Sequence, residues 1–231
     1  MTRLSMHADS HRSSIIRVWP VRLDAPPDDL ANQTLSVEEQ LRAQRFHQPS
    51  EHDRFVVGHA SLRRLLAREM EQSPAQISIA LGPWGKPYVA HAPALRFNLS
   101  RSVDLAVIAI SYEHEVGVDV EQLRPIPDAL ALARAYFSLS EREALSACAS
   151  HEMHAAFLRV WTRKEAVVKG TGRGLSLPLE SFDVPASPDD ALIHTEADGR
   201  WLVHTFSAAP GYLASVATPN ARARCEVQPA L

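Results

Sequence analysis

Short segments in which hydrophobic and polar residues alternate recur along the chain and predict β-strands. The clearest example is residues 116–121, where valine occupies every second position and Asp119 and Glu121 share the other face. The same criterion, together with β-branched and aromatic content, predicts strands elsewhere. The predicted strands are 15–19, 76–81, 95–99, 105–111, 116–121, 181–184, 201–206 and 212–217.

Apolar residues spaced three or four positions apart predict helices between these strands. Two helix starts are marked by serine followed three positions later by glutamate, the spacing of a capping box, at Ser36 and at Ser140. Glycines at positions 170, 172 and 174 end the last and most apolar helix. The predicted helices are 36–47, 51–71, 128–137, 140–149 and 152–170.

The order of the predicted elements repeats once. In each half a long helix with an aromatic residue, Phe55 or Trp161, precedes a glycine-containing loop and then strands. Periodicity alone leaves the division open, but it is compatible with an α+β fold of two similar halves. We expect a flexible segment at 1–14, an N-terminal half at 15–115 and a C-terminal half at 116–231.

Composition narrows the class of protein. Of the 231 residues, 45% are hydrophobic and 22% are charged, which is ordinary for a globular protein. The net charge of -3 gives no indication of a nucleic-acid partner. The two cysteines, Cys148 and Cys225, match no zinc-binding spacing, and a reducing compartment suits them. No signal peptide is apparent, and the apolar run at 105–110 is too short to span a bilayer. We therefore expect a cytoplasmic protein that does not enter a membrane.

Asp119 and Glu121 are two positions apart on a predicted strand, so both carboxylates project from one face, roughly 6.5–7 Å apart at the backbone. Like charges on one face repel unless a cation lies between them, and Mg²⁺ prefers carboxylate oxygens combined with water and phosphate ligands. The other interpretation is a solvated strand face that carries two acids. The pair alone does not decide between the two.

Glu165 and Lys169 lie one helical turn apart beside Trp161. A plain exposed ion pair of this orientation would contribute about 0.3–0.5 kcal/mol. Apolar neighbours, the glycine-rich exit and the nearby cations Arg163, Lys164 and Arg173 favour a different interpretation. We interpret the segment as a basic surface beside a carboxylate that would suit a phosphorylated ligand.

Together these segments resemble the surfactin-type 4′-phosphopantetheinyl transferases. The two signatures of that family, G-[V/I]-D-[V/I]-E and W-[S/T]-x-K-E-[A/S]-x-x-K, correspond to GVDVE at 117–121 and WTRKEAVVK at 161–169. The continuation GRGLSLPL at 172–179 and the upstream segments GKP at 85–87 and FNLS at 97–100 also match in order. The resemblance covers about residues 40 to 217.

The resemblance implies a pseudo-dimer of two α+β halves with coenzyme A bound in the cleft between them. The enzyme would transfer phosphopantetheine to a serine of an apo acyl, peptidyl or aryl carrier protein and release 3′,5′-ADP. It would be a monomer that needs Mg²⁺. The implied Mg²⁺ ligands are Asp119, Glu121 and Glu165.

The resemblance also implies roles for individual side chains. Glu165 would be the general base, directly or through a water, and Lys169 would stabilise the leaving group beside the phosphates. Asp119 and Lys169 would both contact the coenzyme A pyrophosphate. The remaining implied contacts concern the adenine, ribose and 3′-phosphate end of coenzyme A: Gly85, Lys86, Pro87, Ser100 and Arg42.

Two positions depart from the family pattern. Arg101 stands where many relatives have histidine, and arginine still binds phosphate but does not titrate. Glu39 stands at a position that is basic in relatives, for which Arg45 could compensate.

Two other classes of function use the same residues. A metal-dependent phosphodiesterase or nuclease could employ the three acids, and a non-catalytic module could hold a carrier protein or coenzyme A. The acids together with Lys169 favour an enzyme over the module.

Overall fold

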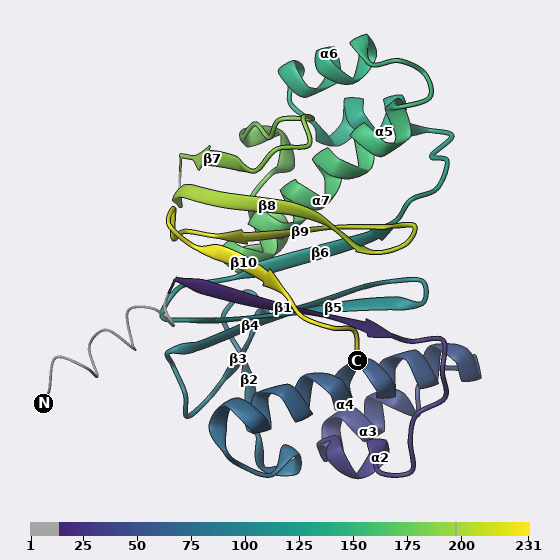
Figure 1. The fold of residues 1–231 in the computed structure, drawn as a ribbon, viewed down its shortest axis with the longest axis vertical. Helices are drawn as coiled ribbons and strands as arrows, with labels where there is room; N and C mark the ends of the chain where they lie inside the picture. The colour runs from purple at the N-terminus through teal and green to yellow at the C-terminus, as the bar shows by residue number, and fades with distance from the viewer. Residues whose placement is uncertain (1–13, 197) are drawn as a thin grey trace, which may run out of the picture.

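In the part of the chain that the computed structural model describes, residues 14–196 and 198–231, two four-stranded sheets stack at the centre (Figure 1). The first sheet has the order β10-β1-β5-β4, formed by β1 (Ile15–Arg22), β4 (Leu95–Ser102), β5 (Leu105–Tyr112) and β10 (Arg224–Val227). The second has the order β6-β9-β8-β7, formed by β6 (Gly117–Gln122), β7 (Ala191–Thr195), β8 (Gly199–Ala209) and β9 (Tyr212–Thr218).

Helix α4 (Pro49–Met70) covers the outer face of the first sheet. Pro49 occupies the first turn of this helix, where its missing N–H is not needed, and so starts the helix. Leu62 and Leu66 pack against Trp19, Phe97 and Ile108. The smaller elements of this half are α2 (Ala31–Thr34), α3 (Val37–Ala43), the 3₁₀ turn Pro74–Gln76, β2 (Ile79–Leu81) and β3 (Pro87–Val89).

Helix α7 (Met153–Thr171) covers the second sheet in the same way, with α5 (Ala129–Tyr136) and α6 (Leu139–Ala147) beside it. Its buried residues Val160 and Val167 pack in a core with Phe137, Phe157 and Trp201. Each half therefore consists of one long helix on the outside of one sheet, which confirms the predicted fold class of two similar α+β halves.

The inner faces of the two sheets pack against each other. In β5, Val107 and Ala109 face the second sheet, whereas Ala106 and Ile108 face α4, as the period of two requires. Val116, Val118 and Val120 fill the same inner layer from the second sheet, all at 1% exposure or less. Burying a valine side chain contributes about 1.5–3 kcal/mol, so the shared layer stabilises both halves together.

The last strand crosses from one half to the other. β10 pairs in parallel with β1, with Val227 opposite Val18, and the backbone N–H of Leu231 donates to the Pro20 carbonyl. The C-terminal end of the chain therefore lies on the sheet of the N-terminal half, as Figure 1 shows in yellow beside purple.

The structure corrects several sequence predictions. Residues 181–184 are not a strand: Leu179–Ser181 is a 3₁₀ turn, followed by irregular chain. The predicted strand 76–81 is shortened to Ile79–Leu81. The second capping box is Ser138 with Glu141, so α6 begins earlier than predicted. The α-helix and the strands that were not predicted are α2, β3, β7 and β10, and the 3₁₀ turns were not predicted either.

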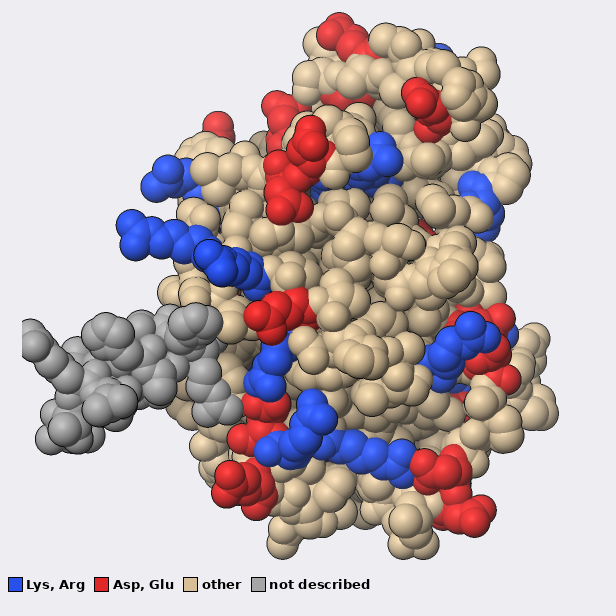
Figure 2. Space-filling view, in the orientation of Figure 1, with Lys and Arg blue, Asp and Glu red and all other residues tan. Residues whose placement is uncertain are grey.

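Two further expectations concern the segment 1–14 and the absence of a membrane-spanning segment. The predicted flexible segment 1–14 lies, apart from Ser14, outside the described residues. Among the described helices, none combines the length and the apolar character needed to cross a membrane. Figure 2 shows basic and acidic side chains of the described residues interleaved over one face of the molecule, in agreement with the small net charge.

Candidate functional site

Strand β6 presents two carboxylates on the face opposite its valines. Asp119 is 4% exposed and Glu121 is half-buried. Gly117 opens the strand where β6 approaches α7 closely: a Cβ there would lie 2.1 Å from the Ala166 carbonyl oxygen. Only glycine allows this approach, which brings the acids of β6 next to the polar side chains of α7.

Asp119 is held from two other elements. Ser100 on β4 donates a hydrogen bond to Asp119 Oδ1 at 2.9 Å, and Lys169 on α7 donates to the same oxygen at 2.5 Å. Lys169 Nζ also donates to Ser100 Oγ at 3.0 Å. Asp119 Oδ2 is buried and has no partner among the described residues. A buried carboxylate oxygen without a donor is costly, so this atom is suited to bind a cation.

Glu121 and Glu165 lie in electrostatic reach of Asp119. Burial raises the pKa of each of these three carboxyls. The Lys169 ammonium opposes this rise in the pKa of Glu165, and the charges of Asp119 and Glu121 add to it. Neighbouring negative charge thus adds to the raised pKa of Glu121 and of Glu165, and a shared cation would favour the ionised forms of the acids.

The residues fit a Mg²⁺ ion that also binds substrate. Among the described residues, no three of His, Cys, Asp and Glu approach as a ready-made metal cluster. Mg²⁺ usually takes one or two protein carboxylates and completes its shell with water and phosphate oxygens, so a closed protein cage is not required. The orphaned Asp119 Oδ2 and the half-buried carboxyls of Glu121 and Glu165 supply suitable hard oxygen donors.

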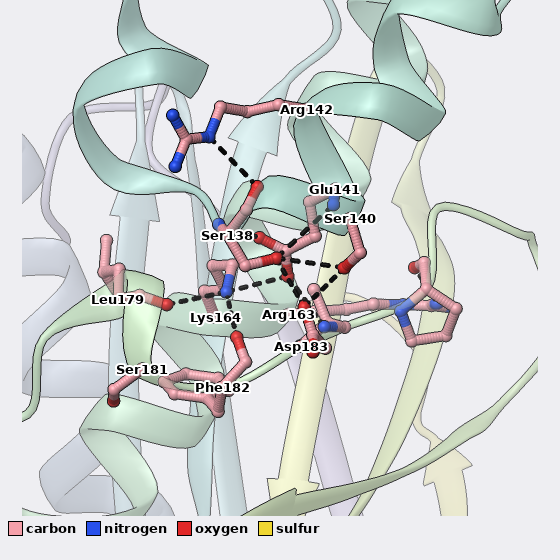
Figure 3. Close-up of polar contacts among 12 residues, drawn as sticks. Ser138, Ser140, Glu141, Arg142, Arg163, Lys164, Leu179, Ser181, Phe182 and Asp183 are labelled. Atoms are coloured by element: carbon pink, nitrogen blue, oxygen red, sulfur yellow. Dashed lines mark hydrogen bonds and ion pairs between the residues drawn. The ribbon is translucent and has the colours of Figure 1, made fainter.

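The two cations before Glu165 do not face this site. Arg163 and Lys164 are fully buried, and Figure 3 shows them among Ser138, Glu141 and Asp183. Lys164 Nζ donates to Glu141 Oε1 and to the Leu179 carbonyl at 2.7 Å each, and to the Phe182 carbonyl at 2.5 Å. Arg163 donates to the carbonyls of Pro185 and Asp189.

The expectation that Arg163 and Lys164 add to a phosphate-binding surface is therefore wrong. Arg163 and Lys164 lie two and one residues before Glu165, so at about 100° per residue they project from other sides of the helix than Glu165 and Lys169 and enter the C-terminal core. Both side chains instead fix the segment that follows the helix.

Lys86 bridges the two halves. Its ammonium donates to Glu115 Oε2 at 2.5 Å, to the Val116 carbonyl at 3.1 Å and to the Gly170 carbonyl at 2.6 Å. Burial lowers the pKa of Lys86, and Glu115 opposes that shift. An ammonium has three donors, and these contacts use all of them, so Lys86 joins the end of α7 to the start of β6.

Arg42 and Arg101 lie on an aromatic cluster at the N-terminal helices. The guanidinium of Arg42 is 5.3 Å from the Phe55 ring, and that of Arg101 is 5.9 Å from the Phe46 ring. The two rings are in contact, with centroids 5.4 Å apart. Arg101 also lies 3.2 Å from a carboxylate oxygen of Glu51. The cluster thus gathers two cations at the end of β4. Because successive strand residues alternate faces, Arg101 lies on the face of β4 opposite to the Ser100 side chain.

Glu39 is occupied by the fold. Its carboxylate accepts from the Ser36 backbone in the capping box and from the buried Arg63. It therefore replaces a basic residue of the family pattern with a structural contact.

A cleft of about 790 Å³ opens between the two halves beside Glu165 and Lys169. It is lined from both halves by the side chains of Lys86 and Asn98 on one side and Trp161, Glu165 and Lys169 on the other. Gly85 and Pro87 also line it. The aromatic ring of Tyr136 meets Trp161 edge to face at 6.0 Å, which gives the cleft an apolar wall.

The structure thus brings together most of the predicted site. Asp119, Ser100 and Lys169 are in direct contact, Glu121 and Glu165 are within electrostatic reach, and Lys86 lines the same cleft. Sequence reasoning missed Ser102, whose hydroxyl donates to Glu121 Oε2 at 2.8 Å. Its spacing of two from Ser100, directly after the predicted strand 95–99, was the signal available.

Comparisons with known proteins match each half separately. Residues 115–217 match the model of the 4′-phosphopantetheinyl transferase superfamily, and residues 28–113 match that of the 4′-phosphopantetheinyl transferase N-terminal region.

Similar curated proteins carry the same description. The 4′-phosphopantetheinyl transferase HetI of Nostoc sp. is 35% identical over 183 residues, which are 77% of each chain. The 4′-phosphopantetheinyl transferase Sfp of Bacillus subtilis is 27% identical over 207 residues, 87% of this chain and 91% of the relative. The 4′-phosphopantetheinyl transferase AcpT of Salmonella typhimurium is 42% identical over 121 residues, 52% of this chain and 61% of the relative.

Proposed function

The chain belongs to the 4′-phosphopantetheinyl transferase superfamily, and on this premise we propose how its cleft performs the reaction. The protein is a 4′-phosphopantetheinyl transferase that moves the phosphopantetheine moiety of coenzyme A to a serine of a carrier protein. Family membership favours this activity over a phosphodiesterase or a non-catalytic binding module.

We propose that coenzyme A binds in the cleft between the halves with its pyrophosphate beside Asp119 and Lys169. The single observation that carries this proposal is the contact of Lys169, Asp119 and Ser100, which joins three elements of both halves at one point. Positive charge from Lys169 would there meet the negative charge that develops on the departing nucleotide phosphate.

Asp119, Glu121 and Glu165 would hold Mg²⁺ in this proposal. A bound Mg²⁺ would neutralise charge on the pyrophosphate and so favour its cleavage. Asp119 is the best placed of the three, since its Oδ2 is buried and has no partner in the described part of the protein.

Glu165 would accept the proton of the attacking serine. The new bond forms between the serine oxygen and the β-phosphorus of coenzyme A, and the bond from that phosphorus to the oxygen of 3′,5′-ADP breaks. Burial raises the pKa of Glu165, which strengthens it as a base while Lys169 and a cation favour its ionised form. No covalent enzyme intermediate is needed, because positioning and charge stabilisation suffice for phosphoryl transfer.

Gly85, Lys86 and Pro87 would line the adenine and ribose end of the ligand, and Ser100, Arg42 and Arg101 would lie towards the 3′-phosphate. Two cations on one aromatic cluster support the assignment of Arg42 and Arg101. In Lys86 the ammonium is engaged by Glu115 and two carbonyls, so its aliphatic stem would supply the contact.

We further propose that the protein is cytoplasmic, and that it is a monomer because one chain supplies both walls of the cleft. The acceptors would be carrier proteins that present serine on an acidic helix.

Mass spectrometry of an apo carrier protein after incubation with the enzyme, Mg²⁺ and coenzyme A tests the proposal. We expect the carrier to gain one phosphopantetheine and 3′,5′-ADP to appear in equal amount. Release of 3′,5′-ADP without carrier modification would indicate hydrolysis instead, and coenzyme A binding without either product would indicate a binding module.

A further inference from the structure

Strand β4 presents three polar side chains to β6 at every second position, namely Asn98, Ser100 and Ser102. The two strands are edge strands of different sheets and do not share a backbone ladder. Asn98 Oδ1 accepts from the Val118 backbone N–H at 2.9 Å, in place of a strand partner. Ser100 and Ser102 then reach Asp119 and Glu121, which continue β6 at the same spacing of two.

The Ser102 hydroxyl has a defined direction. Its Oγ accepts from the backbone N–H of Gln122 at 3.3 Å and donates to Glu121 Oε2 at 2.8 Å. One lone pair is thus taken by the backbone while the proton points at the carboxylate. The contact engages Oε2, so Oε1 is the oxygen that this hydrogen bond leaves for another ligand.

Ser102 differs from Ser100 in what else it touches. Ser100 Oγ also accepts from Lys169, so its loss would disturb the candidate phosphate contact as well. Ser102 contacts Glu121 and the backbone of Gln122, and it comes from the half that carries none of the three acids.

We propose that Ser102 is a positioning residue that orients the Glu121 carboxylate towards the divalent ion. The N-terminal half would in this way complete a site whose acids all lie on the C-terminal half. The proposal rests on the proposed function, because it assumes that Glu121 is a metal ligand. Hydrogen-bond partners of ligand side chains typically change metal affinity by about 10–100-fold when they are removed.

Manganese binding gives a readout that does not depend on turnover. Mn²⁺ prefers the same carboxylate and phosphate oxygens as Mg²⁺, and electron paramagnetic resonance counts the free ion in the presence of enzyme and coenzyme A. We expect Ser102→Ala to weaken Mn²⁺ binding about 10–100-fold and to raise the Mg²⁺ concentration for half-maximal transfer in parallel. The Michaelis constant for the carrier protein should stay unchanged.

Two further variants sharpen the test. Ser102→Thr keeps the hydroxyl and should restore Mn²⁺ affinity to near the wild-type value. Ser207→Ala removes an exposed strand serine that donates to the Ala209 carbonyl and should leave Mn²⁺ affinity unchanged. Circular dichroism melting without metal gives the folded fraction of each variant. If the loss of Mn²⁺ affinity in Ser102→Ala is no larger than its loss of folded protein, the proposal is overturned.

The outcomes separate this inference from the function on which it rests. Suppose that the wild type binds Mn²⁺ and transfers phosphopantetheine, and that Asp119→Asn no longer binds Mn²⁺. If folded Ser102→Ala then binds Mn²⁺ within twofold of the wild type, the proposed role of Ser102 is wrong and the proposed function stands. If the wild type neither binds Mn²⁺ nor modifies a carrier, both are wrong.

Discussion

Lys169 Nζ lies 2.5 Å from Asp119 Oδ1, while Oδ2 of the same carboxylate is buried without a partner among the described residues. The Asp119 carboxylate thus has the Lys169 ammonium on one oxygen, whereas the other oxygen lacks a hydrogen-bond donor among the described residues. The arrangement supports Lys169 and a metal ion acting on opposite sides of Asp119 rather than competing for it.

Metal and coenzyme A together should therefore stabilise the folded protein. A ligand at 100 times its Kd contributes about 2.7 kcal/mol, and for a chain of this length 1 kcal/mol corresponds to a Tm change of about 2–4 °C. We expect Mg²⁺ with coenzyme A to raise the Tm of the wild type by about 5–10 °C. In Asp119→Asn the Mg²⁺-dependent part of this rise should disappear, and an undiminished rise would contradict the assignment of Asp119 as a ligand.

Glu165→Gln should lower transfer by at least about 10²–10⁴-fold, the usual contribution of a general base. The fold should remain intact because the replacement has nearly the same shape. Steady-state kinetics with a mass-spectrometric readout of the carrier measures the loss. Near-normal turnover would remove Glu165 from the mechanism.

The same variant carries a pH-dependent prediction. Burial raises the pKa of Glu165 in the folded protein above its pKa in the unfolded chain. At pH values between these two pKa values the folded state binds more protons than the unfolded state, so the free energy of unfolding falls as the pH rises. Without metal, Glu165→Gln should therefore melt at a higher temperature than the wild type at neutral pH. The difference should close as the pH falls below the unfolded pKa of glutamate. Melting curves from acid to neutral pH test the sign.

Lys164 and Glu141 should be essential for stability rather than chemistry. Both are nearly inaccessible to solvent, and removal of one partner leaves a buried charge without compensation. Lys164→Ala or Glu141→Ala should each cost about 3–5 kcal/mol in urea unfolding. The exposed pair of Arg64 with Asp28 is a matched control, and Asp28→Ala should cost at most about 1 kcal/mol. Equal costs for the buried and the exposed pair would contradict this account.

Arg101→Ala should discriminate between two forms of the nucleotide. If the arginine contacts the 3′-phosphate, its removal loses a charge-assisted contact of about 1.5–3 kcal/mol. The Michaelis constant for coenzyme A should then rise about 10–100-fold, whereas that for dephospho-coenzyme A should change little. The exposed Arg64→Ala should affect neither substrate. An equal rise for both substrates would argue against the phosphate contact.

Local patterns predicted the part of the site that lies on regular elements. Alternation in 116–121 separated the buried valines from Asp119 and Glu121, and helical spacing placed Glu165 beside Lys169. These features depend on residues close in sequence, so periodicity alone specifies them.

Features that depend on distant partners were not predictable in this way. Arg163 and Lys164 are residue types usually found on the surface. Their burial is made possible by the carbonyls of residues 179–189 together with the Glu141 carboxylate and the Thr205 hydroxyl. The same carbonyls explain why 181–184 is not a strand, since the Phe182 carbonyl accepts from Lys164 rather than from a neighbouring strand. β10 is short and polar, and its strand character comes from pairing with β1.

The pairing of β10 with β1 also has a consequence for synthesis of the protein. Ile15 leaves the ribosome early, but its partner Arg224 follows almost the whole chain later. Until then β1 lacks one neighbour, and an unpaired strand edge is a site for wrong association. Newly made chains should therefore depend most on chaperones in the interval before residues 224–227 emerge, and a translational pause just before the codons of β10 should lower the yield of active enzyme.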